Sequence, residues 1–406
     1  MAQAQNPAMH IDPLPWMNAA PTLAVLAALG SGNARFVGGA VRDALLGRTV
    51  LDIDIATTLH PEEAMRLLAA SGIQAVPTGL AHGTVTAVAP PLKFEITTLR
   101  RDVETFGRRA RVAFTGDWAA DAARRDFTMN ALYLDQHGDV FDYVAGLPDL
   151  FAGRVRFVGD ARTRIREDVL RLIRFYRFHA HYGRGAADAE AREAARELKT
   201  LAANLSAERV AAEVMKLLAA PDPVPTLRMM REDGVLAVVL PQAQGLDRLA
   251  ALVALEPAPD PVRRLGALAA SGANDAALRL KLRKSERDRL AAMAQPPWPV
   301  DLAADARAQA RALHRLGAAL YADLVLLRAA EGGDGARARA LLDFAASARP
   351  QRFPLKGRDV TARGVAPGPE VGRLLAEIEA WWEAGDFAAG RKECLAALEQ
   401  RLSRGA

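Results

Sequence analysis

Two aspartates separated by one residue are the first candidates for chemistry in this chain. Asp52 and Asp54 stand in the run Leu51-Asp52-Ile53-Asp54-Ile55, which alternates like a short strand. On a strand this spacing sends both carboxylates to one face, where they could hold Mg²⁺ together with substrate phosphates. The ordinary alternative is a solvated strand edge without an ion. We take Asp52 and Asp54 as candidate catalytic and metal-binding residues for phosphoryl transfer.

A pair of glycines precedes the aspartates. The run Val37-Gly38-Gly39-Ala40-Val41-Arg42-Asp43 reads as a strand, a tight turn and a helix start. Because glycine has no Cβ, backbone amides near Gly39 can approach a phosphate, and Arg42 can reach a triphosphate oxygen. A lone Gly-Gly pair indicates only a turn. Its short spacing from Asp52 favours a phosphate cradle beside the metal pair.

A third group follows at Arg125, Asp126 and Asn130, which offer a charged donor, an acceptor and an amide ahead of a strand. These groups could bind phosphate and ribose hydroxyls. The alternative is a surface ion pair of little energetic value.

The fourth group is a basic row. Asp168 and Arg171 are i,i+3 neighbours on an expected helix, and Arg174 and Arg177 continue the row. Cytosine and adenine each present an amino donor beside a ring-nitrogen acceptor, which suits a carboxylate and a guanidinium. Uracil and guanine present a carbonyl beside a ring N–H, a mismatch of about 1 to 3 kcal/mol for each group. The pair therefore predicts a preference for C and A, unless it is only a helix-surface salt bridge.

Short strand-like runs alternate with helical ones over the first 150 residues, and Leu/Ala/Arg/Glu-rich helical spacing follows after about Gly153. This pattern predicts a mixed α/β half followed by helices. The expected strands are Arg35 to Val37, Leu51 to Ile55, Gly83 to Val88, Phe94 to Thr97 and Ala131 to Leu134, and the clearest early helices are Val41 to Leu46 and Pro61 to Ala70.

Composition excludes several classes of protein. The chain has 406 residues, half of them apolar and a quarter charged, which fits a multidomain globular protein. Its one cysteine, Cys394, cannot form an internal disulfide or a multi-cysteine zinc site. No apolar run approaches the roughly 18 residues of a membrane span, and no basic leader precedes Arg35. We expect a cytoplasmic protein without a membrane partner.

Net charge permits a polyanionic partner. The chain carries a formal charge of +5, and the segment from Arg154 to Arg177 alone holds eight arginines against three acids. The excess is concentrated in the segment that contains the proposed base-reading row.

In order and spacing, these elements resemble the class II tRNA nucleotidyltransferase and bacterial poly(A) polymerase family, which belongs to the polymerase-β-like nucleotidyltransferases. The resemblance covers about the first 220 residues well. It rests on the Gly-Gly-x-Val-Arg-Asp start, Asp52 and Asp54, His82-Gly83-Thr84, Phe94 to Arg100, Arg125-Asp126, Gly146-Leu147-x-Asp149-Leu150, Glu167-Asp168-x-x-Arg171 and Ser206-x-Glu208-Arg209-x-x-x-Glu213.

The resemblance implies an α+β fold, with a nucleotidyltransferase head built on a small mixed sheet and then all-α neck, body and tail domains. The expected ranges are 1–150 for the head, 151–220 for the neck, 221–300 for the body and 301–406 for the tRNA-binding tail. It implies Mg²⁺ at Asp52 and Asp54, and a base pair-like contact with Asp168 and Arg171. The other nucleotide-binding residues that it implies are Gly39, Arg42, Arg125, Asp126, Asn130, Arg174 and Arg177.

Further roles are implied for residues around these motifs. Glu95 to Arg109 would form the mobile loop associated with the switch from C to A addition, and Glu95 could be a third metal-facing carboxylate. Glu208, Arg209 and Glu213 would brace the neck helices.

The hypothesis is a Mg²⁺-dependent, template-independent enzyme that completes the 3′ CCA end of tRNA from CTP and ATP. A poly(A) polymerase, a CC-adding enzyme and an A-adding enzyme remain alternatives. A non-catalytic RNA-binding module is a further alternative, which the intact carboxylate pair disfavours. The oligomeric state stays open.

Overall fold

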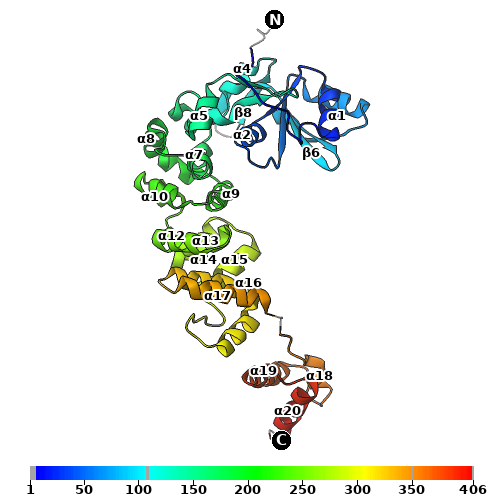
Figure 1. Ribbon diagram of the computed structural model, residues 1–406, viewed down its shortest axis with the longest axis vertical. Helices are drawn as coiled ribbons and strands as arrows, with labels where there is room; N and C mark the ends of the chain where they lie inside the picture. Colours follow the sequence, from blue (N-terminus) through cyan, green and yellow to red (C-terminus); the bar gives the residue numbers. More distant parts are fainter. Residues whose placement is uncertain (1–5, 107–108, 349–350, 405–406) are drawn as a thin grey trace. The chain divides into compact units, whose positions relative to one another are not determined.

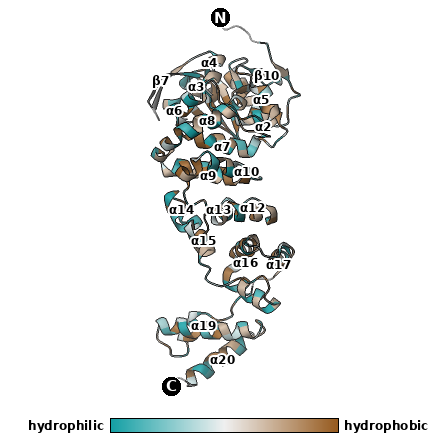
Figure 2. Cartoon of the chain, turned by 90° about the vertical axis from the view of Figure 1, so that its left-hand side faces the viewer, coloured by the Kyte–Doolittle hydropathy of each residue, from teal (hydrophilic) through white to brown (hydrophobic). Residues whose placement is uncertain are grey.

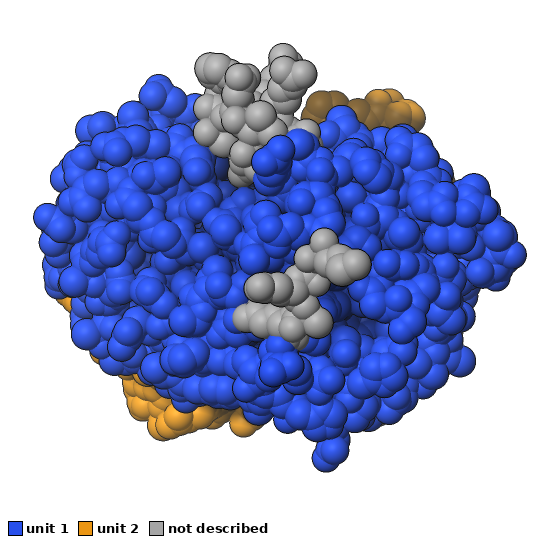
Figure 3. All heavy atoms as spheres, turned by 90° about the horizontal axis from the view of Figure 1, so that it is seen from above, with its two compact units in different colours: residues 1–243, 278–282 blue, residues 244–277, 283–406 orange. Residues whose placement is uncertain are grey.

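The computed structural model describes residues 6–106, 109–348 and 351–404. The chain forms two compact units, one of residues 1–243 with 278–282 and the other of residues 244–277 with 283–406. Figure 3 draws the two units in different colours. All the residues proposed for the site belong to the first unit.

The head is organised around an eight-stranded mixed sheet with the order β1-β10-β9-β2-β3-β6-β5-β4. Strands β3 and β6 run parallel, whereas their outer neighbours pair antiparallel to them. A separate hairpin is formed by β7 and β8. The strands are β1 (Met9–His10), β2 (Ala34–Val37), β3 (Ile53–Thr57), β4 (Gln74–Gly79), β5 (Thr84–Ala89), β6 (Leu92–Thr98), β7 (Arg100–Phe106), β8 (Arg109–Phe114), β9 (Leu132–Leu134) and β10 (Asp139–Asp142).

Local sequence explains how the head elements begin and which face they bury. In β3, Ile53 and Ile55 are buried, whereas Asp54 between them lies half-buried on the opposite face. Helix α3 starts at Pro61 and carries two acids in its first turn, which suits the positive end of the helix dipole. The head helices are α1 (Ala20–Leu29), α2 (Gly39–Leu45), α3 (Pro61–Ala70), α4 (Trp118–Ala123) and α5 (Gly146–Ala152).

The face of the sheet that supports the site has its own apolar core. Val37, Ala56, Leu99, Trp118 and Tyr133 are buried together in one cluster. Val37 is the last residue of β2, and Trp118 begins α4, so this core fixes the turn after β2 and helix α4 against the same sheet. Two segments that carry candidate residues are thereby held in place.

The remainder of the first unit is helical. Its helices are α6 (Ala161–Glu167), α7 (Leu170–Tyr182), α8 (Ala189–Leu198), α9 (Ala207–Leu218), α10 (Val224–Glu232) and α11 (Val235–Val239). Helix α7 buries one side through Leu172, Ile173, Phe175 and Tyr176, and it packs against α9. Figure 2 shows hydrophobic and hydrophilic residues on the same helices, as expected for amphipathic elements.

The second unit is built from helices. They are α12 (Leu246–Leu255), α13 (Pro261–Ala269), α14 (Ala273–Arg279), α15 (Lys284–Ala294), α16 (Ala306–Ala330), α17 (Gly335–Ser347), α18 (Gly357–Thr361), α19 (Pro369–Ala384) and α20 (Arg391–Arg404), of which the end of α14 belongs to the first unit. One apolar cluster joins α16 to α17 around Tyr321 and Leu341, and another joins α18, α19 and α20 around Ile378 and Leu398. Short 3₁₀ helices lie at Leu80–His82, Thr128–Asn130, Lys199–Asn204 and Ala270–Gly272.

The predicted α+β class, with a mixed-sheet head followed by helices, is confirmed (Figure 1). Among the described residues after Gly153, the structure contains helices and no strand. Two details were wrong. Asp52 lies just before β3 and not on it, and the strands β1, β4, β7, β8 and β10 were not expected. The division at 150, 220 and 300 stays a prediction. No helix in the described ranges is long and apolar enough to cross a membrane.

Burial of the head core gives a testable stability difference. Phe94 on β6 is fully buried, whereas Phe151 on α5 is 45% exposed. We expect Phe94→Ala to lower the free energy of unfolding of the head by about 3–5 kcal/mol, because it leaves a cavity. Phe151→Ala should cost about 0.5 kcal/mol or less. Urea denaturation followed by near-UV circular dichroism measures both, and equal losses would contradict the assigned core.

Candidate active site

Three carboxylates meet at the beginning of β3. Asp54 is the second residue of β3, and the parallel register with β6 sets it opposite Glu95. Asp52 precedes the strand and is exposed, as is Glu95, whereas Asp54 is half-buried. The sheet therefore brings Glu95 to the aspartate pair from a position 41 residues along the chain.

The electrostatics of Asp54 indicate an excess of negative charge. Burial raises the pKa of Asp54 to about 6, and the charges of Glu95 and Asp52 act in the same direction, against the opposing effect of Arg125 and Arg42. Carboxylates that repel one another in this way are suitable ligands for a divalent cation, because the cation would reduce the repulsion.

The predicted glycine turn lies directly beside Asp54. Gly38 ends the link from β2 to α2 with φ 68° and ψ −127°, a backbone conformation that favours glycine. A Cβ at Gly38 would lie 3.7 Å from Asp54 Oδ2 and 3.9 Å from Arg125 Nη1. The absence of a side chain at Gly38 thus leaves space between the carboxylate and the guanidinium, and Gly39 begins α2 next to it.

Arg42 is buried and held on several sides. Its Nη1 donates to Asn130 Oδ1 at 2.8 Å, and its Nε and Nη2 donate to Asp43 at 3.0 and 2.8 Å. The guanidinium carbon lies 4.1 Å from the centre of the Tyr182 ring. Asp43 and Tyr182 were not singled out from the sequence, although Asp43 directly follows Arg42.

Asp126 connects Asn130 to helix α7. Asn130 Nδ2 donates to Asp126 Oδ1 at 3.1 Å, and Arg174 Nε donates to Asp126 Oδ2 at 2.9 Å. Burial opposes the charge of Asp126, but Arg174 and the hydrogen bonds outweigh it and lower the pKa of this carboxyl. Asp126 is therefore a charged acceptor that ties the segment after α4 to α7.

Arg125 is fixed along one edge by a residue that the sequence analysis missed. Its Nη2 donates to Asp121 Oδ2 at 2.8 Å and its Nε donates to the Tyr133 hydroxyl at 3.2 Å. Arg124 donates to the other oxygen of Asp121 at 2.6 and 2.8 Å. The i,i+3 and i,i+4 spacing of Asp121 from the two arginines was a signal that could have found this cluster.

The side chains of Asp168 and Arg171 are each paired, but not with one another. Asp168 lies in the break between α6 and α7 with φ −146° and ψ 104°, so the expectation that it sits on the helix was wrong. Its oxygens accept from Arg209 Nη2 at 2.7 and 3.0 Å. Arg171 Nη1 donates to Glu167 at 2.5 Å, while its Nη2 donates to the carbonyl of Arg124 at 3.2 Å. The Asp168 side chain keeps 34% of its surface exposed.

Arg174 and Arg177 share one buried acid from the neighbouring helix. Glu213 of α9 lies 2.6 Å from Arg177 Nε and 3.7 Å from Arg174 Nη1. Burial lowers the pKa of Arg177, and the charges of Arg174 and Arg42 lower it further, although Glu213 opposes them. This end of the site therefore gathers three arginines, Arg42, Arg174 and Arg177, beside the carboxylates of Asp43, Asp126 and Glu213. Glu213 contacts Arg177 of α7, Arg209 contacts Asp168 before α7, and Glu208 contacts Lys281 at 2.9 Å, whereas the bracing role that the resemblance implied stays a prediction.

The segment from Glu95 to Arg109 comprises the end of β6, the strand β7 and the first residue of β8. Residues 107 and 108 lie outside the described residues. Its expected role as a mobile loop stays a prediction.

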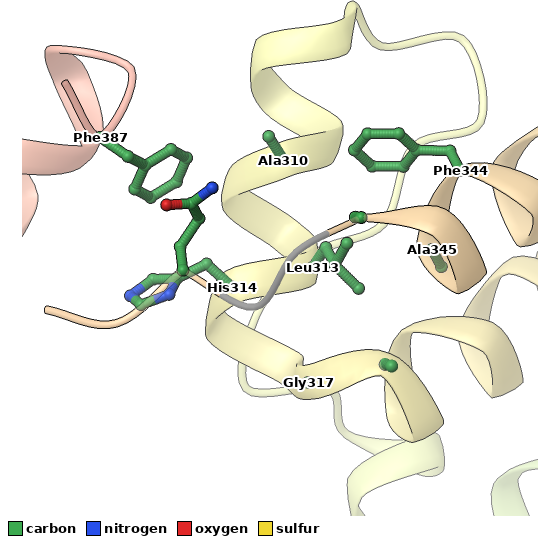
Figure 4. A pocket seen from close by; sticks show the side chains of 10 residues that line it. Ala310, Leu313, His314, Gly317, Phe344, Ala345 and Phe387 are labelled. Atoms are coloured by element: carbon green, nitrogen blue, oxygen red, sulfur yellow. The ribbon is translucent and has the colours of Figure 1, made fainter.

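Two other features of the second unit lie apart from these residues in sequence. One is an apolar pocket of about 350 Å³, lined by ten residues that include no carboxylate. Figure 4 shows His314, Phe344 and Phe387 among them. His314, Glu379 and Glu383 form a group with ligand atoms within 4.8 Å of one another. Both glutamates of this group already contact Arg315, at 3.3 and 2.6 Å. Neither feature includes a residue that the sequence predicted for catalysis.

Comparisons with known proteins agree with this arrangement. The family model described as "Poly A polymerase head domain" matches residues 34–156, and the one described as "Probable RNA and SrmB- binding site of polymerase A" matches residues 187–246. The protein named "CCA tRNA nucleotidyltransferase 1, mitochondrial" from Danio rerio is 33% identical over 384 residues, which cover 90% of this chain and 87% of that protein. The chain belongs to the CCA tRNA nucleotidyltransferase family.

Other members of the family match in sequence and in structure. The CCA-adding enzyme of Bacillus pumilus is 41% identical over 206 residues, which cover half of each chain. The crystal structure of the Bacillus stearothermophilus CCA-adding enzyme in complex with CTP superimposes with a TM-score of 0.77 at 28% identity, covering 95% of this chain and 98% of that one. Membership in this nucleotidyltransferase family implies a need for a divalent metal ion.

The charge of Asp54 can be titrated directly. In metal-free protein we expect its carboxyl to titrate with a pKa of about 6, and Glu95→Gln to lower that pKa because one repelling charge is removed. Carboxyl ¹³C NMR measures the titration. Glu62→Gln on the exposed side of α3 serves as the control and should leave it unchanged. A pKa that does not respond to Glu95→Gln would contradict the carboxylate grouping.

Proposed function

We propose that this nucleotidyltransferase adds or repairs the 3′-terminal CCA of tRNA, using CTP and ATP without a nucleic-acid template. The names of the relatives from Danio rerio and Bacillus pumilus support this activity, and so does the likeness to an enzyme solved with CTP. The proposed partners are accordingly tRNA, CTP and ATP.

The observation that carries the proposal is the presence, within the first unit, of a carboxylate group around Asp54 and Glu95 and an arginine group around Arg174 and Arg177. Burial and the charges of Glu95 and Asp52 raise the pKa of Asp54, whereas burial and the charges of Arg174 and Arg42 lower the pKa of Arg177. A nucleoside triphosphate with its metal ion would stabilise the charged forms of both groups. Its cation would bind the carboxylates, and its phosphates would bind the arginines.

We assign Mg²⁺ as the ion and Asp52 and Asp54 as the residues that would hold it, with Glu95 beside them. A bound divalent ion supplies activation of the RNA 3′-hydroxyl and stabilisation of the departing pyrophosphate. On the protein side, Gly38 and Gly39 leave room for phosphate oxygens near Asp54, and Arg125 borders this space through Nη1. Arg42, Arg174 and Arg177 are proposed to bind the phosphates, and Asp126 and Asn130 the ribose.

Asp168 and Arg171 are proposed to read the base. In this role Asp168 accepts from the amino group of cytosine or adenine, and Arg171 donates to the ring nitrogen beside it. Arg209 and Glu167 contact these side chains in the protein alone, at 2.7 and 2.5 Å. We therefore expect the incoming base to share or replace these contacts.

A poly(A) polymerase is the main alternative, since the matched head model carries that description. CC-adding and A-adding enzymes share the same chemistry and stay alternatives. The four-part division into head, neck, body and tail is likewise a proposal. We propose a cytoplasmic location, although the similar vertebrate proteins carry "mitochondrial" in their names.

A primer panel tests the function. The protein should extend tRNA lacking CCA, CA or A to the full end with CTP and ATP, and should leave an unrelated RNA primer untouched. Asp52→Ala and Asp54→Ala should abolish incorporation of both nucleotides because the metal ion loses its ligands. Denaturing gels with labelled nucleotides measure the products. Long A tracts would favour the poly(A) alternative, and activity retained by both variants with Mg²⁺ would refute the metal assignment.

Base selection is a separate prediction. Asp168→Ala and Arg171→Ala should lower the preference for CTP and ATP over UTP and GTP by about 10- to 100-fold. Each variant removes a side chain whose hydrogen-bonding groups do not match uracil or guanine. Competition assays with mixed nucleotides measure the preference. Arg166→Ala is a suitable control, since Arg166 is an exposed arginine of the same segment that pairs with Glu197. Unchanged discrimination in the first two variants would leave base reading to other groups.

A further inference from the structure

Asp121 is a fully buried carboxylate on α4 that lies under the proposed nucleotide site. It accepts from the Tyr133 hydroxyl at 2.7 Å and from Arg124 and Arg125 on its two oxygens. Burial alone would raise its pKa, but Arg125 and Arg124 outweigh this and lower the pKa of Asp121 to about 2. The carboxylate is therefore charged wherever the protein is folded near neutral pH.

One oxygen of Asp121 binds Arg125, which is proposed to bind phosphate. Oδ2 accepts from Arg125 Nε at 3.2 Å and from Nη2 at 2.8 Å, so this edge of the guanidinium is occupied. Arg125 Nη1 is the donor nearest to Gly38, 3.9 Å from the position of a Cβ there. The ion pair with Asp121 thus determines which edge of Arg125 is turned toward the space beside Asp54.

The other oxygen binds Arg124, whose carbonyl contacts Arg171. Oδ1 accepts from Arg124 at 2.6 and 2.8 Å, and Arg124 Nε also donates to the carbonyl of Arg100. The carbonyl of Arg124 in turn accepts from Arg171 Nη2 at 3.2 Å. Through this peptide Asp121 restrains the guanidinium that is proposed to read the base.

We propose that Asp121 is a positioning residue that holds Arg125 and Arg171 at a set separation, so that phosphate binding and base choice depend on one buried charge. The inference rests on the proposed function, because it takes Arg125 and Arg171 as nucleotide-binding groups. Asp121 itself touches neither the metal pair nor the base in this role. Its effect passes through the two neighbouring arginines.

The chain contains a matched cluster that lacks these connections. Asp233 is also buried, and it also pairs with two arginines and one tyrosine hydroxyl, namely Arg192, Arg196 and Tyr176 at 2.8, 2.7 and 2.8 Å. None of these residues is among those proposed to bind the nucleotide. Replacing Asp233 therefore removes the same kind of buried charge from the same unit.

The experiment compares Asp121→Asn with Asp233→Asn, and Tyr133→Phe with Tyr176→Phe, in the full-length protein. Isothermal titration with CTP, ATP, UTP and GTP measures nucleotide affinity and the ratio of CTP to UTP affinity without requiring tRNA. We expect Asp121→Asn to weaken CTP and ATP binding by about tenfold and to reduce the CTP to UTP ratio, since the arginines lose their common anchor. Tyr133→Phe should change both in the same direction but less, and the two variants of the Asp233 cluster should leave the ratio unchanged.

Several results would overturn the inference. One is a folded Asp121→Asn protein, verified by circular dichroism, with the wild-type CTP to UTP ratio. Another is an equal decrease of the CTP to UTP affinity ratio in Asp233→Asn, which would indicate a general effect of destabilisation. If Asp121→Asn does not fold, an unchanged ratio in Tyr133→Phe overturns the inference. Failure of the wild-type protein to extend tRNA would refute the proposed function alone, because nucleotide binding is measured without tRNA.

Discussion

The arrangement of the candidate site depends on a few buried acids that keep many arginines apart. Asp121 lies between Arg124 and Arg125, and Glu213 lies between Arg174 and Arg177. Buried guanidinium groups without such partners would repel one another and lose their hydration. Because each acid takes one edge of its arginines, the side chains are held in defined orientations. The cost of burying these charges is consistent with a site prepared for an anionic ligand.

The fold supplies the opposite charge from a different element. The parallel pairing of β3 with β6 sets Asp54 opposite Glu95, and Gly38 at the end of β2 leaves space beside them. Asp126 then connects this part of the head to α7 through Arg174. Acids and arginines are thus drawn from separate segments but belong to one compact unit. Separated charges in one region are what a metal-nucleotide complex requires.

What could be predicted from the sequence was local. Asp52, Asp54 and the glycine turn follow from short spacing, and the helical character after Gly153 follows from composition. The prediction that Asp168 lies on a helix was wrong. It lies in the break before α7, where its side chain contacts Arg209, 41 residues away. Spacing within one helix does not contain that information.

Other parts of the site were missed for related reasons. The pairing of β3 with β6 joins segments that are far apart in the chain. The sequence therefore offered Glu95 as a possible third carboxylate but did not place it beside Asp54. The β7–β8 hairpin is rich in charged residues and lacks the apolar alternation of a buried strand. Asp121 did carry a local signal in its spacing from Arg124 and Arg125. Its significance emerged only from the contacts of Arg124 with Arg171 and of Arg125 with the space beside Gly38.

The most direct test of the account is a crystal structure of the protein with CTP and Mn²⁺, using the anomalous signal of manganese. The account predicts a manganese peak at Asp52 and Asp54, phosphates against Arg42 and Arg125, and the cytosine edge within hydrogen-bond distance of Asp168 and Arg171. A peak at His314, Glu379 and Glu383 with none at the aspartates would contradict it. So would a metal-bound CTP whose base lies away from Asp168 and Arg171.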